Sequence, residues 1–169
     1  MTTPYKNKLN TFSFIFFLLT SASLLGRGFL AGTEVKTPTG YKTIEQLRIG
    51  YLVICYDLET SCVARPVTHI LKQKTDSVVE ISTAGEILFL APDQELFLPH
   101  QNKWVRACEV LQGNILLKHC TQHVYIEQVF VTSQDAVVYD IAVMDYHNFC
   151  VTRQDIHVHN FALAVGFVW

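Results

Sequence analysis

The stretch YKTIEQLRIGYLVI (residues 41–54) returns in matching form 63 residues later as WVRACEVLQGNILL (residues 104–117). Both copies place an aromatic residue first, then two apolar residues three positions apart, a glycine and an apolar run. Similarity of this kind within one chain indicates duplication of a structural unit. Because there are only two copies, at a spacing longer than that of solenoid repeats, we predict two lobes related by pseudo-twofold symmetry.

The rest of the chain has the pattern of β-strands. From Thr33 onward, β-branched and aromatic residues occur in short runs separated by Gly, Asp, Asn and Pro. No segment keeps an apolar 3.6-residue period for more than about three turns, and only the stretches around Ile44 and Ala107 have spacing that suits a helical turn. A chain of 169 residues has room for one ordinary domain. We therefore predict one all-β domain.

Four of the expected strands lie in two groups. PVTHILKQ (66–73) and SVVEIST (77–83) are separated by a short polar stretch, and so are HVYIEQVFVT (123–132) and AVVYDIAVMD (136–145). Polar residues between apolar runs are typical of turns, so each run is predicted to be a separate strand.

Composition excludes several classes of function. Half of the residues are hydrophobic, 17% are charged and the formal charge is -2, which argues against a disordered chain and against nucleic-acid binding. The five cysteines form no CxxC pair, so neither a zinc knuckle nor a thioredoxin-like motif is indicated. Their odd number leaves at least one thiol free in a monomer, the expected state, and their pairing stays open. They are Cys55, Cys62, Cys108, Cys120 and Cys150.

The amino terminus has the features of a secretory signal. Lys6 and Lys8 precede an apolar run over residues 12–25, and Ser21-Ala22-Ser23 supplies the small-x-small pattern of a cleavage site. The run is shorter than the roughly 20 apolar residues that a membrane-spanning helix needs. Residues 1–27 are therefore predicted to be a signal peptide with a short linker, and the protein to be exported. An uncleaved membrane anchor is the alternative.

Two histidine groups are candidate metal ligands. His157 and His159 lie on one face of a predicted strand, and His119, Cys120 and His123 lie close together in the sequence. Neither group supplies four ligands at a recognisable spacing, so no metal site and no cofactor are predicted.

Asp93 and Glu95 flank Gln94 and are candidates for a hydrolytic carboxylate pair. They have no identified partner acid. We interpret them as solvated turn residues.

Four stretches together resemble the Hint domains shared by inteins, hedgehog autoprocessing modules and processing domains of bacterial polymorphic toxins. The resemblance spans about residues 28–160 and implies an all-β, two-lobed Hint fold. It is specific because the first and last blocks stand at opposite ends of an all-β chain. The blocks are GFLAGTEVKTPTGYKTIEQLRIG, LFLAPDQELFL, NKWVRACEVLQGNILL, and the closing pair VVYDIAVMDYHNFCV and IHVHN.

The resemblance implies two half-reactions, of which the first lacks its residues. In the family, an opening Cys attacks the upstream carbonyl and forms a thioester, assisted by Thr and His in the second block. This chain has Gly28 at the Cys position, Ala91 at the Thr position and Gln94 at the His position. The amino-terminal chemistry is therefore predicted to be lost.

The second half-reaction keeps its residues. The resemblance implies that Asn160 closes on its own carbonyl to cut the chain, with His159 as proton donor and His147 as the assisting histidine. Phe161 follows, where a splicing intein needs Cys, Ser or Thr, so splicing is excluded. At most a single-turnover cleavage that releases FALAVGFVW (161–169) is expected, with no multiple-turnover enzyme activity.

Other interpretations of the carboxy-terminal end stay open. His159 and Asn160 also suit a relic that satisfies hydrogen bonds at a strand end, in a silent secreted scaffold with a binding or structural role, and the loss of the amino-terminal residues favours this relic. A third alternative is a fragment of a larger toxin-processing system. The apolar tail, residues 161–169, suits an extein remnant, a last strand, or a patch that contacts a membrane or partner. The sequence identifies no particular partner.

Overall fold

The computed structural model describes residues 26–57, 61–119 and 121–159, and these form an all-β fold with short 3₁₀ turns. In chain order the elements are β1 (Phe29–Leu30), β2 (Glu34–Thr37), β3 (Gly40–Thr43), η1 (Ile44–Gln46), β4 (Leu52–Tyr56), β5 (Cys62–Thr83), β6 (Glu86–Leu90), β7 (Glu95–Leu98), η2 (Pro99–Gln101), β8 (Lys103–Arg106), η3 (Ala107–Glu109), β9 (Ile115–Lys118), β10 (Gln122–Val143), β11 (Asn148–Val151) and β12 (Ile156–His159).

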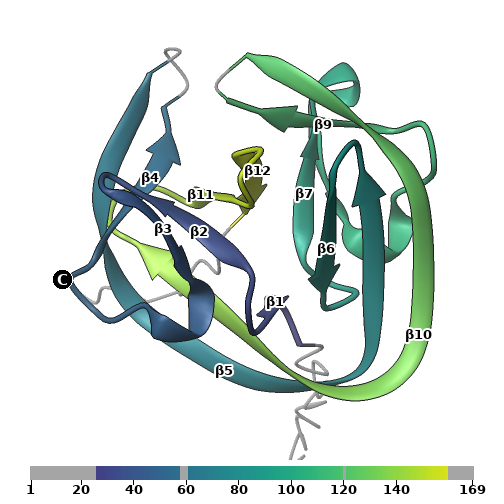
Figure 1. Ribbon diagram of the computed structural model, residues 1–169, viewed down its shortest axis with the longest axis horizontal. Coiled ribbons are helices and arrows are strands. Elements are labelled where there is room, and N and C mark those ends of the chain that lie inside the picture. The colour runs from purple at the N-terminus through teal and green to yellow at the C-terminus, as the bar shows by residue number, and fades with distance from the viewer. Residues whose placement is uncertain (1–25, 58–60, 120, 160–169) are drawn as a thin grey trace, which may run out of the picture.

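Two long strands form the spine of the molecule. β5 and β10 pair antiparallel from Thr83 opposite Ile126 to Val67 opposite Val143. They sweep together around the outside, and β11 and β12 lie within the curve (Figure 1). Shifts in the pairing register interrupt the ladder at three points, and such irregularities bend strands and increase their twist. One continuous ladder thus belongs to both lobes.

The prediction of four separate strands in this region was wrong. The polar stretches that resemble turns lie inside β5 and β10, around the register shift between Ser133 and Ala136. Asp76 and Asp135 are exposed there, so their side chains reach solvent without interrupting the strand. The polar residues mark a bend in each strand.

The pseudo-twofold symmetry is confirmed at the level of single hydrogen bonds. The turns η1 and η3 lie 63 residues apart, as the repeat predicts, although both are 3₁₀ turns. After them, Gly50 N donates to Val67 O at 2.8 Å, and Gly113 N donates to Ile126 O at 2.8 Å. The two glycines have φ of +89° and +84°, a region that favours glycine. The matching residues thus build the same turn in each lobe.

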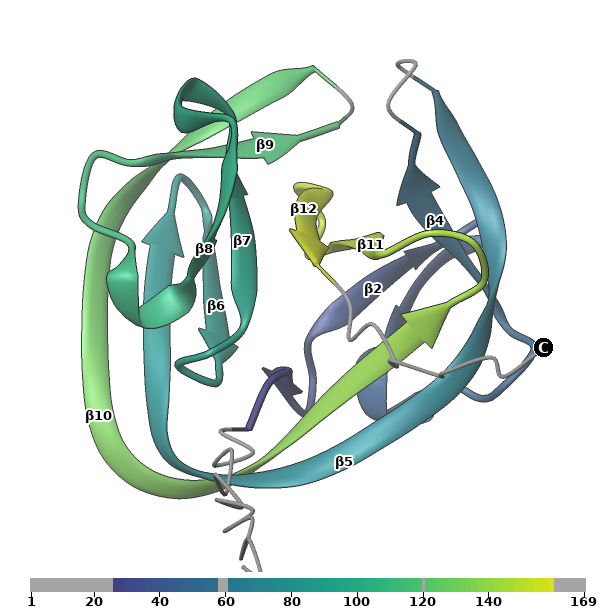
Figure 2. The same ribbon diagram turned by 180° about the vertical axis from the view of Figure 1, so that it is seen from behind.

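β12 lies between the lobes and joins them (Figure 2). It pairs with β11 on one side and with β7 and β9 on the other, with Val158 opposite both Phe149 and Leu96. These residues are fully buried, and Phe149 also packs edge-to-face on Phe29 of β1 at 6.0 Å. The carboxy-terminal strand is therefore held by packing against both halves of the fold.

Asp155, in the turn between β11 and β12, ties the lobes together electrostatically. Its side chain is 2% exposed and accepts a hydrogen bond from Tyr41 Oη at 2.8 Å, while His119 Nδ1 lies 2.7 Å from Oδ2. Lys36 also pairs with this carboxylate. Burial, then the hydrogen bond to Asp155, raises the pKa of Tyr41 to about 12. One buried carboxylate thus holds β2, β3 and the end of β9.

The cysteines divide into bonded and free groups. Cys62 is disulfide-bonded, whereas Cys55, Cys108 and Cys150 are free thiols. Burial raises the pKa of Cys55 and of Cys150 to about 12, so these two thiols stay protonated and unreactive.

Within the described ranges, no helix is long and apolar enough to cross a membrane.

We expect Asp155→Asn to lower the free energy of unfolding by about 2 kcal/mol, because it removes the charge of a buried acceptor that Lys36, Tyr41 and His119 share. Urea denaturation at neutral pH measures this loss. Arg153→Ala is the matched control: Arg153 pairs with Glu34 at 2.7 Å, but its side chain is 71% exposed. Such surface pairs contribute less than about 1 kcal/mol. Equal losses in the two variants would contradict a special role for Asp155.

Candidate functional site

The amino-terminal residues of the predicted site lie together. Gly28 precedes β1, and Ala91 N donates a hydrogen bond to Gly28 O at 2.9 Å. Gln94 N in turn donates to Ala91 O at 3.1 Å. The three positions at which the sequence predicts loss of the amino-terminal groups are therefore joined by main-chain hydrogen bonds.

Gly28 has no side chain, and the space that a side chain would need there is occupied. Its φ is +119°, and a Cβ added there would lie 2.4 Å from Tyr139 O and 2.7 Å from Tyr139 C. These are backbone atoms of β10, which pairs with β1 through Phe29 opposite Tyr139. No L-residue fits this position unless the pairing of β1 with β10 shifts.

Gly28→Ala is expected to lower the free energy of unfolding by about 3 kcal/mol, from backbone strain and overlap together. Gly32→Ala is the matched control. Gly32 has a φ of +89°, but a Cβ there meets no atom of the described residues within 4 Å, so only strain of about 1 kcal/mol applies. Thermal or urea unfolding measures both losses of stability. A loss for Gly28→Ala no larger than that for Gly32→Ala would show that β10 shifts at little cost to make room for the methyl group.

The carboxy-terminal histidines meet at the end of β12. The rings of His147 and His159 stack with centroids 6.2 Å apart and planes 18° from parallel. The His159 side chain is 21% exposed, and its Nδ1 lies 3.6 Å from Glu95 Oε2. Trp104 packs edge-on against the same ring at 4.9 Å. A partly exposed imidazole between a carboxylate and a second imidazole is suited to proton transfer.

The amino-terminal and carboxy-terminal parts of the site are linked through Gln94. Its Nε2 donates a hydrogen bond of 2.7 Å to the main-chain carbonyl of His159. The five predicted site residues that the structure describes thus form one chain of contacts: Gly28, Ala91, Gln94, His159 and His147. The other two, Asn160 and Phe161, lie outside the described residues.

His157 has a different environment from His159. It is buried, with the rings of Tyr56, Trp104 and Phe97 at 5.1, 5.3 and 6.3 Å. Burial, and then the charge of His159, lowers the pKa of His157 to about 4. Neither of its ring nitrogens has a hydrogen-bond partner among the described residues. His157 is therefore a neutral packing group.

Loss of stability in acid is expected from His157. Its pKa of about 4 in the folded protein lies below the unfolded value of 6.5, so the unfolded state binds the proton first. Stability from this residue is complete above pH 6.5 and declines as the pH falls toward 4, by about 2 kcal/mol between about pH 7.5 and about pH 5. His157→Phe should remove this part of the pH dependence. Unfolding curves at the two pH values test it, and an unchanged pH dependence in the variant would contradict it.

The described residues of the two histidine groups form no metal site, and Cys120 of the second group lies outside the described residues. In the part of the chain that the structure describes, no three His, Cys, Asp or Glu side chains are grouped so as to hold a metal ion. His119 is instead paired with Asp155, and the ring of His123 lies against that of His100 at 5.4 Å.

The structure corrects the interpretation of Asp93 and Glu95. Asp93 is only 8% exposed and pairs with Arg106 at 3.4 Å, so it is not a solvated turn residue. Glu95, at the start of β7, contacts His159 and pairs with Arg27 at 3.4 Å. The two carboxylates have separate partners and form no catalytic pair.

Trp104 and Glu95 contact His159, a role that the sequence analysis assigned to neither residue. The repeat contained a usable signal for Trp104, because it matches Tyr41, and both aromatic residues contact the closing segment of the chain. Tyr41 binds Asp155, and Trp104 packs on His159. Glu95 had no such signal, since its contact with His159 depends on the placement of β7 beside β12.

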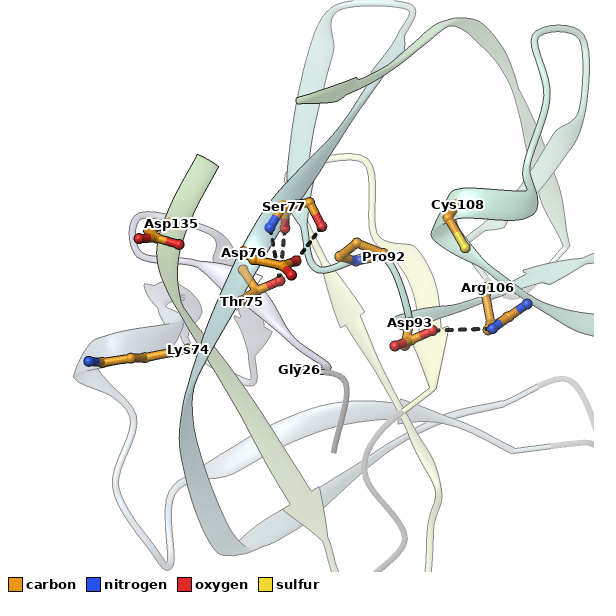
Figure 3. A pocket seen from close by; sticks show the side chains of 10 residues that line it. All are labelled: Gly26, Lys74, Thr75, Asp76, Ser77, Pro92, Asp93, Arg106, Cys108 and Asp135. Atoms are coloured by element: carbon orange, nitrogen blue, oxygen red, sulfur yellow. Dashed lines mark hydrogen bonds and ion pairs between the residues drawn. The ribbon is translucent and has the colours of Figure 1, made fainter. Parts of the chain in front are cut away.

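A groove of about 520 Å³ lies beside the amino-terminal part of the site (Figure 3). It contains the Asp93–Arg106 ion pair and the exposed thiol of Cys108, and it begins at Gly26, two residues before Gly28. None of the predicted site residues that the structure describes lines it. The groove therefore lies next to the cluster of Gln94 and His159 and is no part of it.

The fold is that of intein-like domains. The structure is similar to the solution structure of a bacterial intein-like domain from Clostridium thermocellum, with a TM-score of 0.76 and 25% identity over 80% of this chain and 99% of that chain. It is also similar to a DnaB intein from Synechocystis, with a TM-score of 0.68 and 17% identity over 81% of this chain and all of that one. The gp41-1 intein matches with a TM-score of 0.67 and 22% identity, over 80% of this chain and 99% of that chain.

The pretoxin Hint domain model matches residues 34–161, and the chain belongs to this family. No curated protein matches the chain at a significant level. The predicted Hint fold is thereby confirmed, and the chain is an autoprocessing-type domain by family.

Proposed function

We propose that this domain cuts its own chain once, after Asn160, and releases residues 161–169. The observation that carries the proposal is the pair of stacked imidazoles, His147 and His159, held at the end of β12 directly before Asn160. Family membership supports autoprocessing as the type of activity.

The proposed reaction balances within the chain. Asn160 Nδ2 attacks the carbonyl carbon of its own residue, and a five-membered succinimide forms as the bond to Phe161 nitrogen breaks. Nδ2 gives up one proton, and the departing amine gains one. A partly exposed imidazole such as His159 is suited to carry that proton, and Glu95 and His147 lie beside it. The products are a chain ending in a succinimide and a nine-residue peptide.

The proposal includes loss of the amino-terminal half-reaction and of splicing. Gly28 has no nucleophilic atom, and the close approach of Tyr139 O leaves no room for a side chain. Ala91 and Gln94 replace the family's assisting groups, and Phe161 has no hydroxyl or thiol to accept an acyl group. Only the carboxy-terminal step keeps its residues.

A silent scaffold is the second candidate, and the closure at Gly28 favours it. Under this second candidate, the space of the first nucleophile is closed and β12 with its histidines serves packing alone. Such a protein would act through binding, as a stable exported β domain.

We further infer export. The basic residues and apolar run before Gly26 support it, and they lie outside the described residues. Membership of a pretoxin family and the disulfide at Cys62 agree with an oxidising compartment.

Intact-mass measurement of protein beginning at Leu24, held at neutral pH for days, tests the cleavage. We expect the native sequence to lose residues 161–169 and Asn160→Ala to stay whole. His147→Ala should slow release by roughly tenfold to a hundredfold, because general acid–base assistance contributes on this order or more.

His123→Ala is the matched control, since the His123 ring lies against His100 instead of the stacked pair of His147 and His159. It should cleave at the native rate. An unchanged mass for the native chain would support the scaffold instead.

A further inference from the structure

Gln94 stands where the family has the histidine of the lost half-reaction, yet its side chain is directed to the other half. It lies just before β7 and is 1% exposed. Nε2 donates to His159 O at 2.7 Å and, more weakly, to Glu95 O at 3.2 Å. The side-chain amide therefore reaches the carbonyl that directly precedes Asn160.

The backbone of Gln94 is fixed on both sides, so the amide is presented by a rigid support. Its N–H is bonded to Ala91 O, and its carbonyl accepts a hydrogen bond from Ala107 N at 2.8 Å. Ile44 N makes the equivalent bond to Thr33 O in the other lobe, also at 2.8 Å. Gln94 thus uses the duplicated turn as its anchor.

We propose that Gln94 is a positioning residue for cleavage after Asn160, an inference that rests on the function proposed above. The peptide that joins His159 to residue 160 is planar, so holding its carbonyl oxygen fixes the direction in which the chain enters residue 160. Ring closure needs the attacking nitrogen near its own carbonyl carbon in one orientation, and a defined entry angle raises the fraction of time spent there.

The hydrogen bonding of the amide argues against a purely structural role. Gln94 Oε1 is buried and has no hydrogen-bond partner among the described residues. A buried polar atom without a partner is destabilising, so a side chain serving packing alone is better apolar. The donor on Nε2 is the part of the amide that has a partner at the site.

The test compares Gln94→Glu with Gln94→Leu, following release of residues 161–169 by intact mass between about pH 5 and about pH 8. Both variants keep roughly the size of the side chain. Leu has no donor, so its rate should be at least tenfold below native at every pH. Glu as a carboxylate has no donor either, but the protonated acid donates through its O–H, and burial raises the pKa of a carboxyl group. The rate of Gln94→Glu relative to native should therefore recover as the pH falls.

Unfolding measurements on the same variants separate positioning from stability. Gln94→Leu removes one unpaired oxygen and takes the donor from the carbonyls of His159 and, at the longer distance, Glu95, so its unfolding midpoint should stay close to native. A rate for Gln94→Glu that stays low in parallel with Gln94→Leu at every pH would overturn the positioning role. Native rates in both variants would also overturn it while leaving the proposed cleavage intact. No release from the native chain at any pH would overturn both proposals.

Discussion

The antiparallel pairing of β5 with β10 is the constraint on which the remaining structure depends. Each strand is 22 residues long and passes from one lobe into the other. The ladder holds the two copies of the turn-glycine-strand unit in a fixed relation. It also provides the edge on which β1 rests, at Tyr139 of β10. Because β12 pairs with strands of both lobes, its end is placed by the curvature of this ladder.

The sequence predicted those parts of the fold that local patterns determine. The turns after η1 and η3 require glycine at positive φ, so Gly50 and Gly113 are visible as a repeat in the sequence itself. The continuity of β5 and β10 was not predictable in this way. An exposed polar stretch has the same composition whether the chain turns or bends, and only the pairing across Ser133 and Ala136 distinguishes the two.

The candidate site divides along a similar line. The resemblance located His147, His159 and Gln94, and the structure places His147 and Gln94 each against His159, although their roles stay predictions. The sequence does not show which strands that are far apart in the chain lie side by side in space. The contact of Glu95 with His159, and the bond from Gln94 to the His159 carbonyl, arise because β7 lies beside β12. His157 and His159 are two residues apart and both touch Trp104, yet one is buried among aromatic rings and the other lies partly in solvent.

The closure at Gly28 makes the proposed loss of the first nucleophile hard to reverse. A missing side chain is usually restored by one substitution, since the cavity it left stays in place. Here the carbonyl of Tyr139 occupies that space, 2.4 Å from where a Cβ would stand. A cysteine at position 28 therefore requires a prior change in how β1 meets β10. If the proposed function holds, a return to thioester chemistry passes through a less stable protein, whereas the proposed carboxy-terminal step can be changed by single substitutions.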